Sequence, residues 1–159
     1  HASICKNITH MKANGKYVVN LDCDNFIGNN CDELILNTFN EKGDDIIISQ
    51  TSNIVSSGNG GRISISKENF INLGGYDESF YPMGYQDYDL IERGKKYGLE
   101  YININKNNKA IFNSKNESIK NIGIKIEYNK MNNINKLLSK VNIENNNLKA
   151  NIYRDLSNY

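Results

Sequence analysis

Two aspartates that lie one residue apart, Asp22 and Asp24, directly follow the short apolar run "YVVNL". Carboxylates at the end of a buried strand can bind Mg²⁺ or Mn²⁺, which prefers oxygen ligands and leaves coordination positions open for phosphate oxygens. A cation held there could neutralise the charge on a departing diphosphate. The same pair also arises by chance, or as a polar turn that ends a strand, so other parts of the sequence must decide.

Two further chemistries use aspartates at this spacing. Asp22, Asp24 and Glu33 match ligand positions of an EF-hand calcium loop, but Phe26 and Ile27 stand where an oxygen ligand and a glycine are needed, which excludes that loop. A phosphohydrolase of the haloacid dehalogenase type also carries two aspartates at a strand end, and "IIISQT" resembles its later strand. That family usually continues with Thr or Val, whereas this chain continues with Asn and Phe, so the phosphohydrolase remains the weaker enzyme alternative.

The length, net charge and cysteine count of the chain exclude several classes of protein. A chain of 159 residues is long enough for one domain with a core. Nineteen basic and 18 acidic residues give a formal net charge of +1, which argues against binding to nucleic acid or to an anionic membrane through bulk charge. No apolar segment is long enough to span a membrane, and the first residues lack the pattern of a signal peptide, so we expect neither a membrane span nor a signal peptide. The three cysteines form neither a CxxC pair nor an even set, so we expect a reduced, cytoplasmic protein without disulfides or zinc.

Periodicity and turn signals predict an α/β fold in which helices alternate with short buried strands. Helices are predicted at residues 3–13, 30–40, 67–75 and 87–97, with Ser66 as an N-cap and the Gly74-Gly75 pair as a stop. Strands are predicted at 17–21, 44–51, 62–66, 99–104 and 109–112. The tail has helical spacing at Ile134, Leu137, Leu138 and Val141.

The second acidic cluster strengthens one interpretation. The segment "GGRISISKENFINLGGYDESFYPMGYQDYDLIERGKKYGLEY" resembles the C-terminal half of GT-A glycosyltransferases, of the family 2-like, galactosyltransferase-like and capsule-biosynthesis types. Upstream, "SICKNITHMKANGKYVVNLDCDNFIG" resembles the same family's Arg-Asn helix, its Ala-x-Gly-x-Tyr turn and its metal-binding DxD motif. Order and spacing agree from residue 1 to about 113.

The resemblance implies a GT-A-like mixed sheet flanked by helices, with a partial catalytic domain at 1–113 and a helical C-terminal extension at 114–159. It implies transfer of a hexose such as galactose, N-acetylgalactosamine or glucose, with inversion, from a nucleotide diphosphate, most simply a UDP-sugar, to a carbohydrate hydroxyl in polysaccharide or capsule biosynthesis. Mn²⁺ or Mg²⁺ would bind at Asp22 and Asp24, and Asp87 would be the catalytic base. The donor or substrate would contact Lys6, Asn7, Gly60, Gly61, Arg62, Tyr85 and Gln86.

Asp87 has a physical rationale that does not depend on the family. Inverting transfer needs a base on one side of the sugar carbon and a stabilised leaving group on the other. The positive end of a helix favours an ionised carboxylate at Asp87, although the same residue could simply cap that helix. Asp89 is expected to be structural. Tyr81 and Tyr85 could stack on a sugar or line the core, and the sequence does not decide between these roles.

The chain departs from the family pattern in two places. The family often supplies a histidine to the metal after the acidic helix, whereas Asn113 stands near that position here. The family's first strands are also missing, so we expect a fragment or a shortened relative whose exposed sheet edge favours self-association. A non-catalytic remnant that binds carbohydrate or a partner is therefore the alternative to an enzyme.

Overall fold

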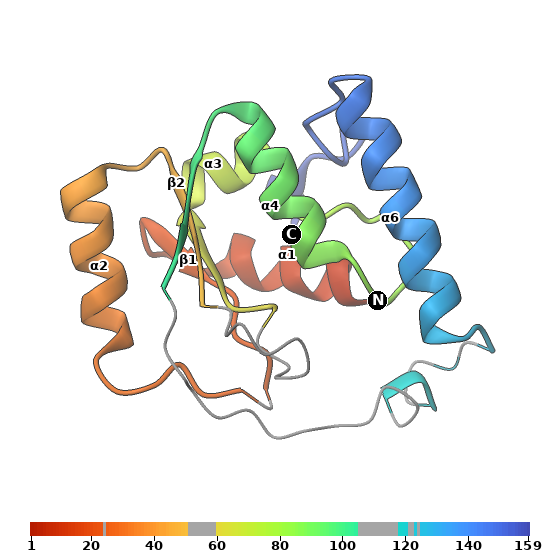
Figure 1. Ribbon diagram of the computed structural model, residues 1–159, viewed down its shortest axis with the longest axis horizontal. Coiled ribbons are helices and arrows are strands. Elements are labelled where there is room, and N and C mark those ends of the chain that lie inside the picture. The colour runs from red at the N-terminus through yellow and green to blue at the C-terminus, as the bar shows by residue number, and fades with distance from the viewer. Residues whose placement is uncertain (24, 51–59, 105–117, 121–122, 124) are drawn as a thin grey trace.

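The computed structural model describes residues 1–23, 25–50, 60–104, 118–120, 123 and 125–159. In this part of the chain four strands form one mixed sheet, and helices cover both of its faces (Figure 1). This is the α/β class that the sequence predicts. No helix in the described ranges is long and apolar enough to cross a membrane.

The sheet has the order β1-β3-β2-β4. Strand β3 is antiparallel to both β1 and β2, and β2 is parallel to β4. The carboxyl ends of β1, β2 and β4 therefore lie at the same edge of the sheet as the start of β3. The strand bounds are Tyr17–Val19 for β1, Ile46–Ser49 for β2, Ile63–Ser66 for β3 and Glu100–Asn103 for β4.

Helices on both sides bury the two central strands completely. Helix α2 (Cys31–Lys42) covers one face and packs Ile35 and Phe39 against Ile46 and Ile48 of β2. The other face is covered by α1, α3 and α4, and α6 lies outside α4 (Figure 1). Because both faces are covered, the serines of β3 are as buried as its isoleucines. These helices span Ala2–Lys12 (α1), Lys67–Asn72 (α3), Gln86–Tyr97 (α4) and Tyr128–Glu144 (α6).

The predicted start and stop signals of α3 are confirmed. The Ser66 hydroxyl accepts a hydrogen bond from the Asn69 amide at 3.3 Å and caps the helix. Gly74 and Gly75 then turn the chain with φ of +70° and +67°, which side chains other than glycine rarely adopt. A Cβ on Gly74 would also lie 2.0 Å from the carbonyl oxygen of Ala150, so the turn packs directly on the C-terminal segment.

The predicted helix in the tail is present as α6, but its apolar residues do not form its packed face. Leu137, Leu138 and Val141 are exposed, whereas Asn135 and Ser139 are buried. The reason is the loop at 81–84, which has backbone groups that need partners. The Asn135 side chain accepts from the Tyr81 amide and donates to the carbonyls of residues 81, 83 and 84. The predicted strand at 109–112 lies outside the described residues.

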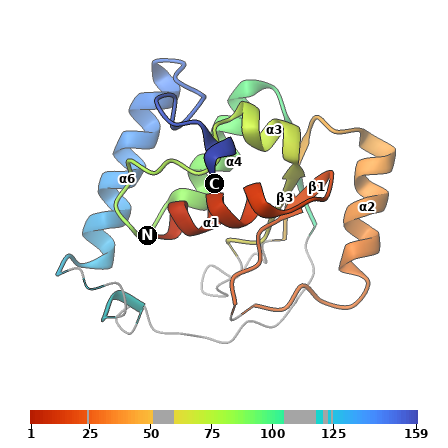
Figure 2. The ribbon, with the colours of Figure 1, turned by 180° about the vertical axis from the view of Figure 1, so that it is seen from behind.

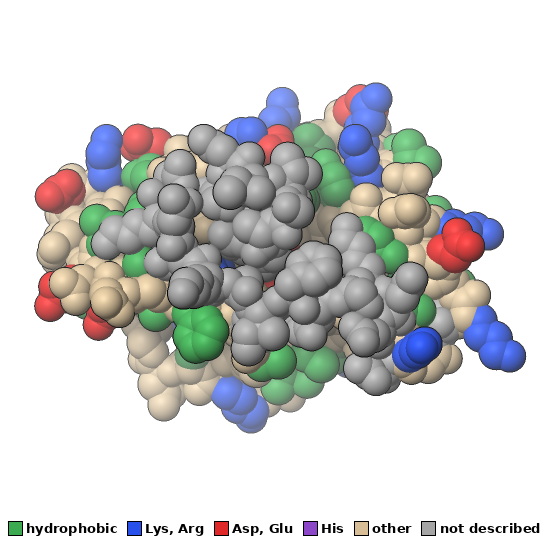
Figure 3. Space-filling view, turned by 60° about the horizontal axis from the view of Figure 1, so that its bottom comes forward, with side chains coloured by type: hydrophobic (Ala, Val, Ile, Leu, Met, Phe, Trp, Pro, Cys, Tyr) green, Lys and Arg blue, Asp and Glu red, His purple; other side chains and the backbone are tan. Residues whose placement is uncertain are grey.

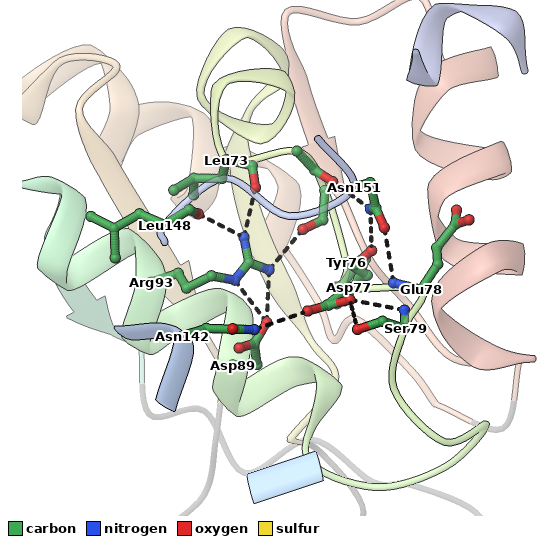
Figure 4. A network of polar contacts seen from close by, with 12 residues as sticks. Leu73, Tyr76, Asp77, Glu78, Ser79, Asp89, Arg93, Asn142, Leu148 and Asn151 are labelled. Atoms are coloured by element: carbon green, nitrogen blue, oxygen red, sulfur yellow. Dashed lines mark hydrogen bonds and ion pairs between the residues drawn. The ribbon is translucent and has the colours of Figure 1, made fainter. Parts of the chain in front are cut away.

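A buried guanidinium joins α4 to the Gly74–Gly75 turn and to the C-terminal segment (Figure 4). Arg93, only 1% exposed, pairs with Asp89 at 2.7 Å and donates to the carbonyl oxygens of Leu73, Gly75 and Leu148. Asp89 is thus structural, as predicted. The C-terminal 3₁₀ turn lies against α1 (Figure 2). The predicted domain boundary at 113/114 lies outside the described residues and stays a prediction.

We predict that Arg93→Met lowers the free energy of unfolding by about 3–5 kcal/mol, because it leaves the Asp89 carboxylate and the Gly75 carbonyl buried without their partner. The control is Lys95→Met on the same helix, whose ion pair with Glu92 is exposed and should change stability by less than about 0.5 kcal/mol. Urea unfolding of both variants measures the difference. Equal effects of the two substitutions would contradict the structural role of Arg93.

Candidate functional site

Three charged side chains from distant parts of the chain meet at the carboxyl edge of the sheet. The Lys6 ammonium of α1 donates to an oxygen of Asp87 at 2.6 Å and lies 3.7 Å from an oxygen of Asp22. Asp22 follows β1, and Asp87 is in the first turn of α4. Two of the predicted site carboxylates therefore face one shared cation.

Close packing around Gly61 fixes the position of the Asp22 carboxylate. The buried Asn20 amide donates both to the Gly61 carbonyl at 2.6 Å and to Asp22 at 3.2 Å. A Cβ added to Gly61 would lie 2.7 Å from the other oxygen of Asp22. The absence of a side chain at Gly61 is thus what lets Asp22 approach the start of β3. By contrast, a Cβ on Gly60 would meet nothing within 4 Å.

The turn before α4 places Asp87 at the positive end of that helix. Gly84 and Tyr85 both have positive φ, 92° and 70°, so the chain reverses sharply just before the helix begins. A Cβ on Gly84 would lie 2.8 Å from the Cβ of Asn132, so α6 packs directly behind this turn. The position of Asp87 near the helix N-terminus, predicted from the sequence, is confirmed.

The Lys6 ammonium remains charged in this setting. Burial acts to lower the pKa of Lys6, but the negative charges of Asp87 and Asp22 and the hydrogen bond to Asp87 outweigh it, so the pKa is raised above its ordinary value. The ring of Tyr76, 5.0 Å from the ammonium, adds a cation–π contact. One ammonium and two carboxylates give this group one excess negative charge, and the Arg62 guanidinium, which attracts Asp22, offsets it.

Asn7 shapes the loop beside this group. Its buried side chain accepts from the Tyr76 amide at 2.8 Å and donates to the Tyr76 carbonyl and to the Glu78 carboxylate. All of these contacts hold the segment that follows the Gly74–Gly75 turn. The role in donor binding that the resemblance implies for Asn7 stays a prediction.

The other predicted donor-binding side chains have their described hydrogen bonds outside the group formed by Lys6, Asp22 and Asp87. Arg62 directly precedes β3, its guanidinium donates to Asn25 at 2.8 Å, and its positive charge attracts Asp22. The Gln86 amide is buried and donates to the Tyr81 carbonyl at 3.0 Å. Tyr85 stacks on the neighbouring Tyr88, with ring centroids 5.7 Å apart. Their roles toward a substrate stay predictions.

Sequence reasoning missed Asn20 and His10. Asn20 lies two residues before Asp22, so strand alternation could have placed both side chains on one face of the sheet. His10 lies one helical turn after Lys6, and its ring donates from Nδ1 to the Lys6 carbonyl at 2.7 Å while it stacks on Phe70. Asn20 contacts Asp22 and His10 contacts the Lys6 carbonyl through hydrogen bonds, and neither residue belongs to a recognisable sequence motif.

The oxygen ligands that the described residues offer can be compared with those that Mg²⁺ or Mn²⁺ prefers. Asp22 offers a half-exposed carboxylate, and oxygen donors of this kind suit Mg²⁺ or Mn²⁺. Asp24 and Asn113 lie outside the described residues. Within the described ranges, no group of three or more His, Cys, Asp or Glu side chains is arranged to hold a metal. The described residues therefore fit a cation that is completed by phosphate oxygens better than a cation enclosed by protein ligands.

The fold is a mixed sheet covered by helices, and Asp22 and Asp87 lie near each other at the edge where β1, β2 and β4 end. This arrangement is consistent with a GT-A-like transferase domain. A family model, glycosyltransferase-like family 2, matches residues 39–158, which include the acidic start of α4. The chain belongs to this family, and membership supports a glycosyltransferase. The matched range begins after Lys6 and Asp22. No curated protein and no solved structure matches the chain.

We predict that His10 makes stability depend on pH. Burial lowers the pKa of its imidazole below the ordinary value of 6.5, so the unfolded chain takes up the proton first and stability falls as the pH drops below that value. His10→Phe keeps an aromatic ring against Phe70 but cannot titrate. Urea unfolding at several pH values should show a smaller loss of stability on acidification for this variant. Identical pH dependence would contradict the assignment.

Proposed function

We propose that this protein is a glycosyltransferase that uses Mg²⁺ or Mn²⁺ and transfers a hexose, with inversion, from a nucleoside diphosphate to a carbohydrate hydroxyl. The observation that carries the proposal is the convergence of Asp22 and Asp87 on the Lys6 ammonium. In this proposal Asp22 helps to bind the cation that holds the diphosphate, and Asp87 is the base. Family membership supports the transferase over the phosphohydrolase hypothesis.

Asp87 is the proposed base. Its side chain is 24% exposed, so an acceptor hydroxyl can reach it from solvent. The proton of that hydroxyl would move to a carboxylate oxygen as the new bond to the sugar carbon forms. The Lys6 ammonium donates a hydrogen bond to one oxygen of this carboxylate and so orients it.

Asp22 and Lys6 would act on the leaving group. Asp22, with Asp24 as the resemblance implies, would hold the divalent ion, which supplies positive charge for the departing diphosphate. The Lys6 ammonium, within 4 Å of Asp22, can add a hydrogen-bond donor to the same phosphate oxygens. Asn20 and Gly61 keep the carboxylate in place.

The proposal also covers which sugar donor and which acceptor the protein uses. A UDP-sugar that carries galactose, N-acetylgalactosamine or glucose, and an acceptor in polysaccharide or capsule biosynthesis, are supported by the resemblance. On the face drawn in Figure 3, the described basic and acidic side chains around the margin are mixed rather than of one sign. A neutral carbohydrate acceptor suits such a surface better than a polyanion does.

Calorimetric titration of UDP in the presence and absence of Mn²⁺ tests the proposal. We expect nucleotide binding that depends on the metal and is lost in Asp22→Asn. Asp87→Asn should keep this binding but reduce sugar transfer by about 10²–10⁴-fold, because only the base is removed. Absence of metal-linked nucleotide binding in the full chain would reject the transferase. Binding without any transfer would instead support a non-catalytic carbohydrate-binding module.

We further predict that Gly61→Ala weakens metal-linked UDP binding at least about tenfold, because the new methyl group displaces the Asp22 carboxylate. Gly94→Ala in α4 is the control, since its new methyl group comes no closer than 3.5 Å to any described side chain and should leave binding unchanged. Calorimetry of both variants, with thermal melts to confirm folding, measures the contrast. Equal binding by the two variants would remove Asp22 from the site.

A further inference from the structure

The end of β2 carries a buried amide that the described contacts leave unused. Gln50 directly follows this strand at the carboxyl edge of the sheet and is only 1% exposed. Neither Oε1 nor Nε2 of its side chain has a hydrogen-bond partner among the described residues. Burial of an amide without partners destabilises a folded protein. A group of this kind therefore points to a partner from outside the chain.

The strand register places Gln50 between a basic and an apolar side chain. Its backbone amide donates to the Arg62 carbonyl at 3.0 Å, so Arg62 is its neighbour on the β3 side. Ile104, whose amide donates to the Ser49 carbonyl at 2.8 Å, is its neighbour on the β4 side. Because side chains alternate along a strand, Gln50 projects to the same side as Ile48, which α2 covers (Figure 1).

A second buried polar group lies beside this amide. Ser64 of β3 is paired with Ile48, which makes Ser64 a diagonal neighbour of Gln50 on the same side of the sheet. Ser64 is 1% exposed, and its hydroxyl likewise has no hydrogen-bond partner in the described part of the chain. Two such groups next to each other indicate a site for a small polar group of a ligand.

These two residues lie near the carboxylate that would hold the cation. Gly61 adjoins Arg62, and a Cβ on Gly61 would lie 2.7 Å from an oxygen of Asp22. Only β3 separates β1 from β2 in the sheet, so Asp22 and Gln50 follow strands that are about 10 Å apart. A sugar attached to a diphosphate at Asp22 would therefore be within reach of the Gln50 amide.

We propose that Gln50 binds the acetamido group of the donor sugar, so that the donor is a nucleoside diphosphate that carries an N-acetylhexosamine. An acetamido group has one N–H donor and one carbonyl acceptor, which together match Oε1 and Nε2 of Gln50. The Ser64 hydroxyl can donate to the same carbonyl, and the acetyl methyl group can pack against Ile104. A single sugar hydroxyl would leave part of this set unpaired. The inference rests on the proposed glycosyl transfer and narrows its donor.

Calorimetric titration of the full chain with Mn²⁺ tests the assignment. The ligands are UDP, UDP-galactose, UDP-glucose and the N-acetylated forms of the two sugar nucleotides. We expect each N-acetylated form to bind at least about tenfold more tightly than its parent, because the parent leaves buried polar groups unpaired. Gln50→Met keeps the length of the side chain but removes the amide. It should make the affinities for the two forms equal and leave the affinity for UDP unchanged.

Thr38→Val is the control for removal of a polar group on the same side of the sheet. The Thr38 hydroxyl donates to the Leu34 carbonyl within α2, so its loss should change neither the affinity for UDP nor the preference for N-acetylated sugars. A thermal melt of each variant separates ligand binding from a structural role. Gln50→Met should melt at the original temperature or above it, because the amide has no described partner to lose.

The possible outcomes distinguish this inference from the proposed function. A clearly lower melting temperature for Gln50→Met would make the amide structural and overturn the assignment. Metal-linked UDP binding with equal affinities for N-acetylated and parent sugars, or a preference that survives in Gln50→Met, would also overturn it and leave the transferase intact. Absence of any metal-linked UDP binding would reject the transferase, and this assignment with it.

Discussion

The buried pair of Arg93 and Asp89 fixes the position of α4, and the candidate site depends on that position. Arg93 satisfies carbonyl groups from the Gly74–Gly75 turn and from the C-terminal segment, so α4 cannot shift along the sheet without leaving them without partners. Asp87 lies two residues before Asp89 on the same helix. Asp89 thus holds the helix in place through its pair with Arg93, and Asp87 in the same turn pairs with Lys6.

The Lys6 ammonium reduces the repulsion between two carboxylates that face it from different parts of the chain. Like charges at short range raise the free energy of the folded state, and an ammonium between them removes most of that cost. Arg62 adds a second positive charge that attracts Asp22. Asn20, His10 and Gly61 contribute through position and shape rather than charge.

The sequence predicted the elements that depend on local signals. Ser66 caps α3, the glycine pair ends it, and the acidic start of α4 lies where the pattern placed it. The meeting of Lys6 with Asp87 could not be derived from spacing, because these residues are 81 positions apart and only the sheet topology brings them together. Resemblance to a family assigned both residues to one site, Lys6 as a donor contact and Asp87 as the base, but did not predict their ion pair.

Other features were not predictable because tertiary contacts overrode the pattern. The alternation of Ile and Ser in β3 suggests one face in solvent, yet helices cover both faces and bury the serines. In α6 the apolar residues suggest the packed side, yet the carbonyls of the loop at 81–84 need hydrogen-bond donors, and Asn135 provides them. Hydrophobic spacing identifies a helix in such cases but does not identify its inner face.

The contacts between the Gly74–Gly75 turn and the C-terminal segment have a consequence for biosynthesis. The Gly74 and Tyr76 carbonyls accept from Asn151, and the Gly74 turn packs on Ala150, so these partners are made about 75 residues later on the ribosome. During translation the Gly74–Gly75 turn lacks these contacts until residues 148–151 leave the ribosome, so the packing of the sheet and α4 is completed only then. A nascent chain stalled before that point would expose to chaperones the side of α4 that carries Arg93.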